Sequence, residues 1–124
     1  MTPSSDERDA IFKTFGRAFF KQNLDLLFTA VTPDFTCIVH DDDTARVLDS
    51  REKIAAFFNE LRGRFANVRF DDVVFHHAPG ATFMTYRKTA ADTASGKTSA
   101  CVGIKRYTFH NGMLTEKGVY SRPI

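Results

Sequence analysis

The sequence KTSACVGIKRYTFHNGMLTEKGVYS, residues 97–121, has the alternating character of a long β-hairpin that reverses at Asn111-Gly112. Asn-Gly is typical of a type I′ turn, because both central positions need a positive φ that these residues tolerate. Neighbouring side chains on a strand point to opposite faces. One face of the first strand therefore carries Cys101, Gly103, Lys105, Tyr107 and Phe109, and the other carries Val102, Ile104, Arg106, Thr108 and His110. Because both faces are partly apolar, we expect helices or a cavity to cover one and another subunit to cover the other.

Two helices are predicted near the start of the chain. Ser4 to Glu7 has the S-x-x-E form of a capping box, and apolar residues then recur at helical spacing, which predicts a helix over residues 6–22. Asn23 is a suitable cap for a shorter helix over 23–31, which Thr32-Pro33 ends because proline restricts the residue before it.

A third helix is the clearest in the chain. Asp49 is predicted to cap it, with Glu52 three residues later as in a capping box. Gly63 near its end is predicted to be a left-handed closing residue. Its apolar positions follow the helical pattern i, i+3, i+4, i+7 and i+11: Ile54, Phe57, Phe58, Leu61 and Phe65.

The remaining segments are predicted to be strands. A strand over 35–40, a turn at 41–43 and a return strand over 45–48 precede the third helix. Strands over 68–78 and 81–90 follow it, joined by a turn at Pro79-Gly80. Helices first and strands afterwards indicate an α+β fold with a mostly antiparallel sheet.

Composition limits the classes of function. A chain of 124 residues with 43% hydrophobic content fits one domain, over residues 1–124. The net charge of +2, with no basic run, argues against nucleic acid as a partner. No apolar stretch approaches the roughly 20 residues of a membrane span, and the polar start lacks a signal-peptide core, so a cytoplasmic location is expected. Cys37 and Cys101 lack metal-ligand spacing and are expected to be buried thiols.

The order of elements resembles the NTF2-like α+β cone, in its SnoaL-like and ketosteroid-isomerase-like branch. The resemblance rests on four segments at this order and spacing: Asn23-Leu24-Asp25, Thr32-Pro33-Asp34-Phe35, Ser50-Arg51-Glu52-Lys53-Ile54 and residues 107–114. It implies a curved sheet around a conical apolar pocket that helices close, and a homodimer through the outer face of the sheet. The functions of that family include isomerases, cyclases, hydrolases and proteins without chemistry, so the fold alone selects none of them.

The resemblance also places residues where a ketosteroid isomerase has its catalytic groups. Phe15 stands in place of the tyrosine, Val39 in place of the base and Lys105 in place of the protonated acid. Phe15 cannot donate a hydrogen bond and Val39 cannot carry a proton, so this chemistry is not expected. A shift of one residue in the first strand would bring His40 to the position of the base.

Lys105 and His40 are the candidate catalytic residues. An ammonium on an apolar strand face suits an anionic ligand or a developing oxyanion, and burial would also make it available as a base or a Schiff-base amine; the alternative is that Lys105 reaches solvent or pairs with a carboxylate. His40, at the end of its strand, would border the pocket mouth and transfer protons. His40 and the aspartates 41–43 are predicted to form a solvated turn and not a metal site.

The sequence therefore predicts a protein that binds a small hydrophobic or aromatic molecule, either as an enzyme or as a non-catalytic binding or protein-interaction module. No cofactor and no metal are expected. Tyr86 and Tyr107 would orient the ligand. The residues expected to line the pocket are Phe15, Phe19, Cys37, Val39, Phe57, Phe58, Tyr86, Cys101, Lys105 and Tyr107.

Overall fold

The computed structural model describes residues 3–41 and 43–124, and its elements follow the predicted order. The helices are α1 (Ser5–Lys21), α2 (Leu24–Ala30) and α3 (Arg51–Arg64). The strands are β1 (Val31–Asp41), β2 (Thr44–Leu48), β3 (Phe65–His77), β4 (Ala81–Asp92), β5 (Thr98–His110) and β6 (Met113–Pro123). The predicted turn at 41–43 includes Asp42, which lies outside the described residues.

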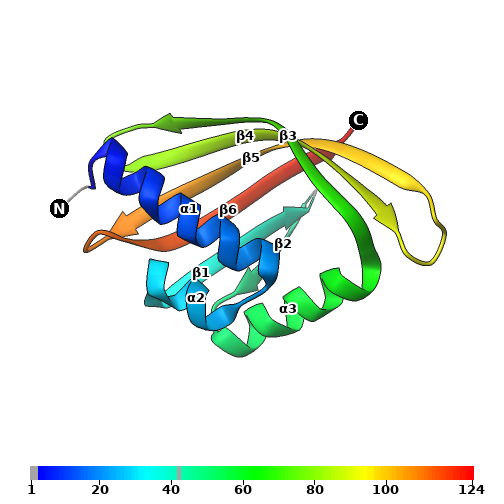
Figure 1. The fold of residues 1–124 in the computed structure, drawn as a ribbon, viewed down its shortest axis with the longest axis horizontal. Helices are drawn as coiled ribbons and strands as arrows, with labels where there is room; N and C mark the ends of the chain where they lie inside the picture. Colours follow the sequence, from blue (N-terminus) through cyan, green and yellow to red (C-terminus); the bar gives the residue numbers. More distant parts are fainter. Residues whose placement is uncertain (1–2, 42) are drawn as a thin grey trace.

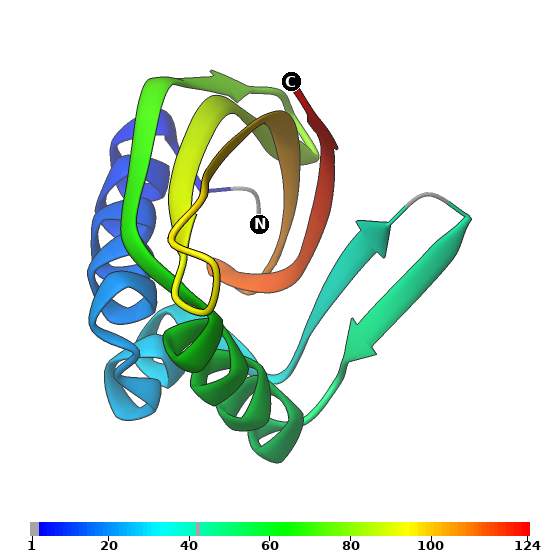
Figure 2. The ribbon, with the colours of Figure 1, turned by 90° about the vertical axis from the view of Figure 1, so that its right-hand side faces the viewer.

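The strands form one sheet in the order β2-β1-β6-β5-β4-β3. Every neighbouring pair is antiparallel except β1 and β6, which run parallel. The predicted α+β fold with a mostly antiparallel sheet is therefore confirmed. The helices cover one face of the sheet (Figure 1), and the long strands bend strongly while the β1–β2 hairpin extends away from them (Figure 2).

The hairpin between β5 and β6 has the predicted turn. Asn111 and Gly112 both have positive φ, 51° and 76°. The alternation along β5 is also as predicted, because Lys105 and Tyr107 are buried while Ile104 and Arg106 are exposed. The face that carries Lys105 and Tyr107 is called the inner face below, and the opposite one the outer face.

The ends of α3 differ from the prediction. Ser50, and not Asp49, is the N-cap, and its hydroxyl accepts a hydrogen bond from the Lys53 backbone N–H at 3.2 Å. The Asp49 carboxylate lies instead 2.7 Å from the Lys53 ammonium, since the serine hydroxyl already occupies the capping position. At the other end α3 passes directly into β3 through Phe65, which is extended, so Gly63 is not a left-handed closing residue.

Strand β3 owes its curvature to two irregularities. Its register with β4 shifts between Ala66 and Arg69 and again between Asp71 and Val74. Within these gaps Asn67 and Asp72 have positive φ of 53° and 54°, a conformation that Asn and Asp tolerate better than most residues. Each bulge bends the strand and increases its twist, which helps the sheet to wrap around the helices.

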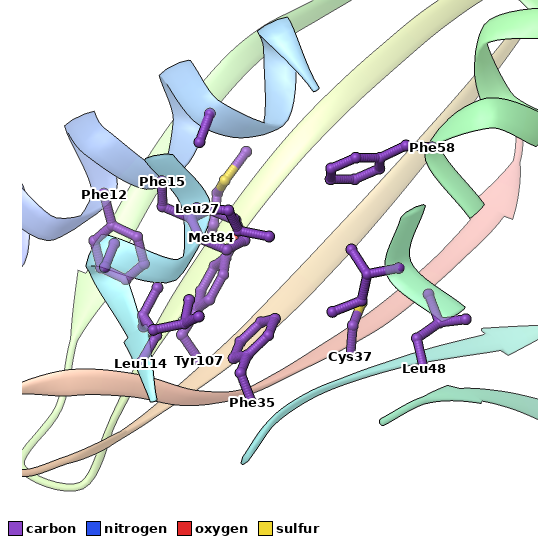
Figure 3. Close-up of a cluster of buried hydrophobic side chains, with 14 of the residues drawn as sticks. Phe12, Phe15, Leu27, Phe35, Cys37, Leu48, Phe58, Met84, Tyr107 and Leu114 are labelled. Atoms are coloured by element: carbon purple, nitrogen blue, oxygen red, sulfur yellow. The ribbon is translucent and has the colours of Figure 1, made fainter. Parts of the chain in front are cut away.

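The core lies between the helices and the inner face. Figure 3 shows Phe12 and Phe15 of α1, Phe58 of α3 and Tyr107 of β5 directed into this space. The Phe12 and Phe15 ring centroids lie 4.7 and 5.8 Å from that of Tyr107, both edge-on. Edge-to-face contacts of this kind add about 0.5–1.5 kcal/mol beyond area burial, so they help to fix α1 on the sheet.

A buried arginine fastens the start of α1 to the β3–β4 turn. Arg8 is buried, and its guanidinium donates to the carbonyl oxygens of Pro3, Ala78, Pro79 and Ala81 and to the Thr82 hydroxyl, at 2.6–3.2 Å. Its carbon Cζ also lies 4.9 Å from the Phe109 ring centroid. Local sequence patterns do not reveal this role, because an isolated arginine in the first helical turn looks like a solvated residue. Within the described part of the chain, no helix is long and apolar enough to cross a membrane.

Candidate functional site

Lys105 lies on the inner face near the middle of β5, and it is only 7% exposed. Its neighbours in register are Met84 on β4 and Val119 on β6, both apolar. The lysine therefore does not reach solvent from the outer face. Among the described residues, none of the ion pairs involves its ammonium. The alternative that a carboxylate on a neighbouring strand partners Lys105 is thus wrong.

A second lysine, Lys117 on β6, is buried beside it, and sequence reasoning missed this residue. Lys117 is 2% exposed and lies in register with Tyr107 of β5 and Cys37 of β1. Lys105 is in register with Val119 and Lys117 with Tyr107, so the two lysines are diagonal neighbours on the inner face, and both amines lie against the Phe19 ring. The site is therefore a pair of neighbouring amines, and not a single cation.

A β-bulge explains why alternation alone does not find Lys117. Counting from the turn, His110 pairs with Met113 and Phe109 with Leu114, which would place Lys117 opposite Arg106 on the outer face. The register shifts between Thr108 and Phe109, so Lys117 pairs with Tyr107 instead. One extra residue on β6 thus turns Lys117 to the inner face.

Aromatic rings surround both amines. The Lys105 Nζ lies 4.7 Å from the Phe70 ring centroid, 5.0 Å from that of Tyr86 and 5.4 Å from that of Phe19. The Lys117 Nζ lies 4.0 Å from the Phe19 centroid and 5.2 Å from that of Phe15. Phe19 of α1 is shared by the two lysines. Each such contact stabilises the protonated amine relative to the neutral one by about 0.5–2 kcal/mol.

Burial opposes that effect and changes the proton affinity of the pair. It lowers the pKa of Lys105 well below its ordinary value, and the positive charges of Lys117 and Lys88 lower it further. Burial also lowers the pKa of Lys117, against a raising effect from Cys37. Lys88, on β4 near the Phe70 ring, has a pKa that burial lowers too.

Repulsion between the two amines decides how many protons they hold. Two unit charges 4 Å apart repel by about 4 kcal/mol at an effective dielectric constant of 20, which exceeds what one ring contact returns. No carboxylate among the described residues neutralises either amine. Repulsion therefore favours one proton on the pair over two, and the larger lowering of the Lys105 pKa makes Lys105 the amine that loses its proton first.

A small hollow between the helices and strands β1 and β6 leads to Lys117. It has room for about one water molecule in this conformation. Lys117 is the one charged residue in its wall, and the other lining residues are Phe15, Phe19, Leu27, Phe35, Cys37, Leu48, Ile54, Phe57 and Phe58. The predicted lining residues Phe15, Phe19, Cys37, Phe57 and Phe58 thus border the hollow.

The other residues predicted to line the pocket lie on the inner face but away from this hollow. Val39 packs against the core, and Tyr86 and Tyr107 are buried in it. The Tyr86 ring lies over Gly103, where an added Cβ would be 2.4 Å from the phenol oxygen. Burial raises the pKa of Tyr86 to about 12 and raises that of Tyr107 as well, so both phenols stay neutral. Cys101 lies farther along β5, in register with Lys88.

His40 does not border the pocket, and that expectation is wrong. Its ring stacks on Tyr120 with centroids 4.2 Å apart and 9° between the planes. Tyr120 is in register with Ile104, and both are exposed on the outer face. Val39, and not His40, points to the core, because the register of β1 leaves odd-numbered residues inward. No group of three or more His, Cys, Asp or Glu among the described residues is placed to hold a metal ion.

Comparisons by sequence find no match: no protein-family model matches the chain, and neither does any curated protein. Solved structures do match its fold. An NTF2-like protein from Burkholderia xenovorans LB400 has a TM-score of 0.84 at 15% identity, with 96% of this chain and 92% of that chain covered. A candidate polyketide cyclase from Xanthomonas campestris pv. campestris has a TM-score of 0.75 at 13% identity, with 93% and 90% covered.

A third match is a protein with a ketosteroid isomerase-like fold from Catenulispora acidiphila, in complex with trimethylamine. Its TM-score is 0.74 at 16% identity, with 97% of this chain and 86% of that chain covered. At identities this low, such matches define the fold and not the activity. The chain therefore has the NTF2-like cone fold, which confirms the resemblance drawn from the order of its elements.

Proposed function

We propose that the protein binds a small hydrophobic or aromatic molecule between the helices and the inner face, with an oxygen of the ligand hydrogen-bonded to the lysine pair. The observation that carries this proposal is the wall of the hollow, which is apolar except for Lys117. Ligand sites typically combine such a wall with a few polar groups that fix orientation. Lys117 donates to a carbonyl or carboxylate oxygen in either protonation state.

Entry of a ligand requires side chains to move, because the hollow holds about one water molecule. Phe19 and Phe57 are the suitable gates, since both border the hollow and both are only partly buried. Phe57 is also covered from outside by Arg46, whose Cζ lies 5.0 Å from the ring centroid. A flat ring that replaces one of these phenyl groups would keep the apolar contacts of the wall.

The test is a titration of the 15N-labelled protein with benzoate, followed by NMR. We expect saturable shifts at Phe15, Phe58 and Lys117. Lys117→Met should weaken binding by about 10–100-fold, because a hydrogen bond to a charged group contributes about 1.5–3 kcal/mol. Lys13→Met, on the exposed side of α1, is the matched control and should bind like the wild type. Shifts confined to the outer face, or equal binding by Lys117→Met, would refute the proposal.

We also propose that the outer face joins two copies of the chain. Val74, Ile104 and Tyr120 lie in one cross-strand row, through Thr85, and are 48%, 45% and 46% exposed. A row of this kind on an open sheet is typical of an interface. Sedimentation equilibrium should show a dimer that Ile104→Lys dissociates. Phe20→Lys, which changes an exposed phenylalanine of α1, should leave the dimer intact, and a monomeric wild type would contradict the proposal.

A further inference from the structure

Two neighbouring buried amines can do more than hold an oxygen atom. Only an amine with a free lone pair adds to a carbonyl carbon, and an exposed lysine near neutral pH has almost none of this form. In the Lys105–Lys117 pair, burial and repulsion favour an unprotonated Lys105, whose pKa is lowered the more, beside the Lys117 ammonium. Lys117 lines the hollow, whereas Lys105 lies against Phe70 and Tyr86.

We propose that Lys117 is a nucleophilic amine that forms an imine with a small aldehyde or ketone, and that Lys105 is the positioning residue that keeps it reactive. This inference rests on the proposed function, because the carbonyl compound occupies the same hollow. It adds a covalent step and assigns the ligand to a chemical class.

The step balances with the two lysines alone. The Lys117 ammonium first passes a proton to the unprotonated Lys105 amine. The Lys117 nitrogen then forms a bond to the carbonyl carbon, the C=O π electrons move to oxygen, and a proton passes from nitrogen to oxygen to give a carbinolamine. The carbinolamine hydroxyl takes a proton from the Lys105 ammonium and leaves as water while the C=N bond forms. The iminium proton then returns to Lys105. The net change is amine plus carbonyl to imine plus water.

Other groups around the pair do not prevent this chemistry. The pKa values of the two lysines are influenced by Lys88 of β4 and Cys37 of β1, and each lysine also influences the pKa of the other. Tyr86 and Tyr107 are neutral, because burial raises the pKa of each phenol. The helices contribute the rings of Phe15 and Phe19 toward the amines. An apolar wall also limits the access of water to an imine.

The experiment uses benzaldehyde and sodium cyanoborohydride, whose hydride adds to the imine carbon and leaves a stable secondary amine. Peptide mass spectrometry then gives the labelling rate of each lysine at pH 7. We expect Lys117 to be labelled at least 10-fold faster than Lys13, with benzoate slowing only the former. Lys105→Met should slow Lys117 labelling several-fold at pH 7 and change its pH profile, because the acceptor for the Lys117 proton is lost, an effect that a merely structural role would not produce.

Two results separate this inference from the proposed function. If benzoate binds and Lys117 is labelled no faster than Lys13, the imine is refuted and the binding site stands. If Lys117 is labelled rapidly in a protein that does not bind benzoate, imine formation is supported and the binding of benzoate expected under the proposed function is refuted. Circular dichroism of the Lys105→Met variant shows whether it is folded, and an unchanged pH profile in a folded variant would refute the role of Lys105.

Discussion

Replacing Lys105 with methionine tests the central physical claim, which is that the folded protein holds fewer protons than the unfolded chain. An unfolded lysine keeps its proton up to about pH 10.4, whereas burial lowers the pKa of Lys105 in the fold. Between the lowered pKa and this upper value the unfolded state binds more protons, so the free energy of unfolding rises with pH. The slope is about 1.4 kcal/mol per pH unit for each proton that the fold excludes.

The magnitude follows from this slope. If the pair excludes one whole proton over this range, the wild type should gain about 3 kcal/mol of stability between pH 7 and pH 9. At pH 7 the exclusion of that proton costs at most about 5 kcal/mol, and the variant loses polar and packing contacts of the amine worth roughly 2 kcal/mol. Lys105→Met should therefore stabilise the protein at pH 7 by about 2–3 kcal/mol, since methionine fills a similar volume without charge.

Urea unfolding at several pH values measures both effects. The chain has no tryptophan and three tyrosines, so far-UV circular dichroism is the practical signal. The Lys105→Met variant should show a smaller rise between pH 7 and pH 9 than the wild type, and the double variant Lys105→Met/Lys117→Met should show the smallest. Lys13→Met is the control and should keep the wild-type slope. A wild type with no pH dependence in this range, or a Lys105→Met variant that is less stable at every pH, would show that the buried pair does not exclude a proton.

Two further changes test the framework around the site. Arg8→Ala should destabilise the protein by about 3–5 kcal/mol, because it leaves several buried acceptors without a donor; Arg8→Lys should recover only part of this, and a loss below about 1 kcal/mol in urea unfolding would contradict the anchoring role. Gly103→Ala should lower the free energy of unfolding by about 1–3 kcal/mol, because its Cβ would meet the Tyr86 ring and the Tyr120 carbonyl oxygen at 2.4–2.9 Å. Gly63→Ala, in α3 with open space around it, should instead raise the free energy of unfolding by about 0.5–1 kcal/mol. Equal effects of the two changes would be inconsistent with the packing described.

Much of the candidate site follows from local sequence rules. The Asn111-Gly112 turn fixes the start of the hairpin, and alternation from there places Lys105 and Tyr107 on one face. Helical spacing likewise puts Phe15 and Phe58 toward the core. These predictions hold because the period of a strand or helix repeats over many residues, so a small error at one end does not change which side chains are buried.

The residues that sequence reasoning misplaced depend on single positions. Ser50 replaces Asp49 as the cap of α3, a shift of one residue between two side chains that both suit the position. The sequence predicts His40 at the pocket mouth, but one step of alternation puts it on the outer face against Tyr120. Arg8 is buried only because the β3–β4 turn lies against α1, a contact between residues far apart in the chain.

The order of elements, the hairpin and the shared face of Lys105 and Tyr107 follow from the sequence, because these depend on short-range periodicity and turn chemistry. Only the tertiary structure showed that Lys105 has a partner. One bulge in β6 turns Lys117 inward, and the packing of α1 places Phe19 over both amines. A change of register and a contact between distant elements leave no pattern in the local sequence. The partner of Lys105 therefore becomes visible only in the fold.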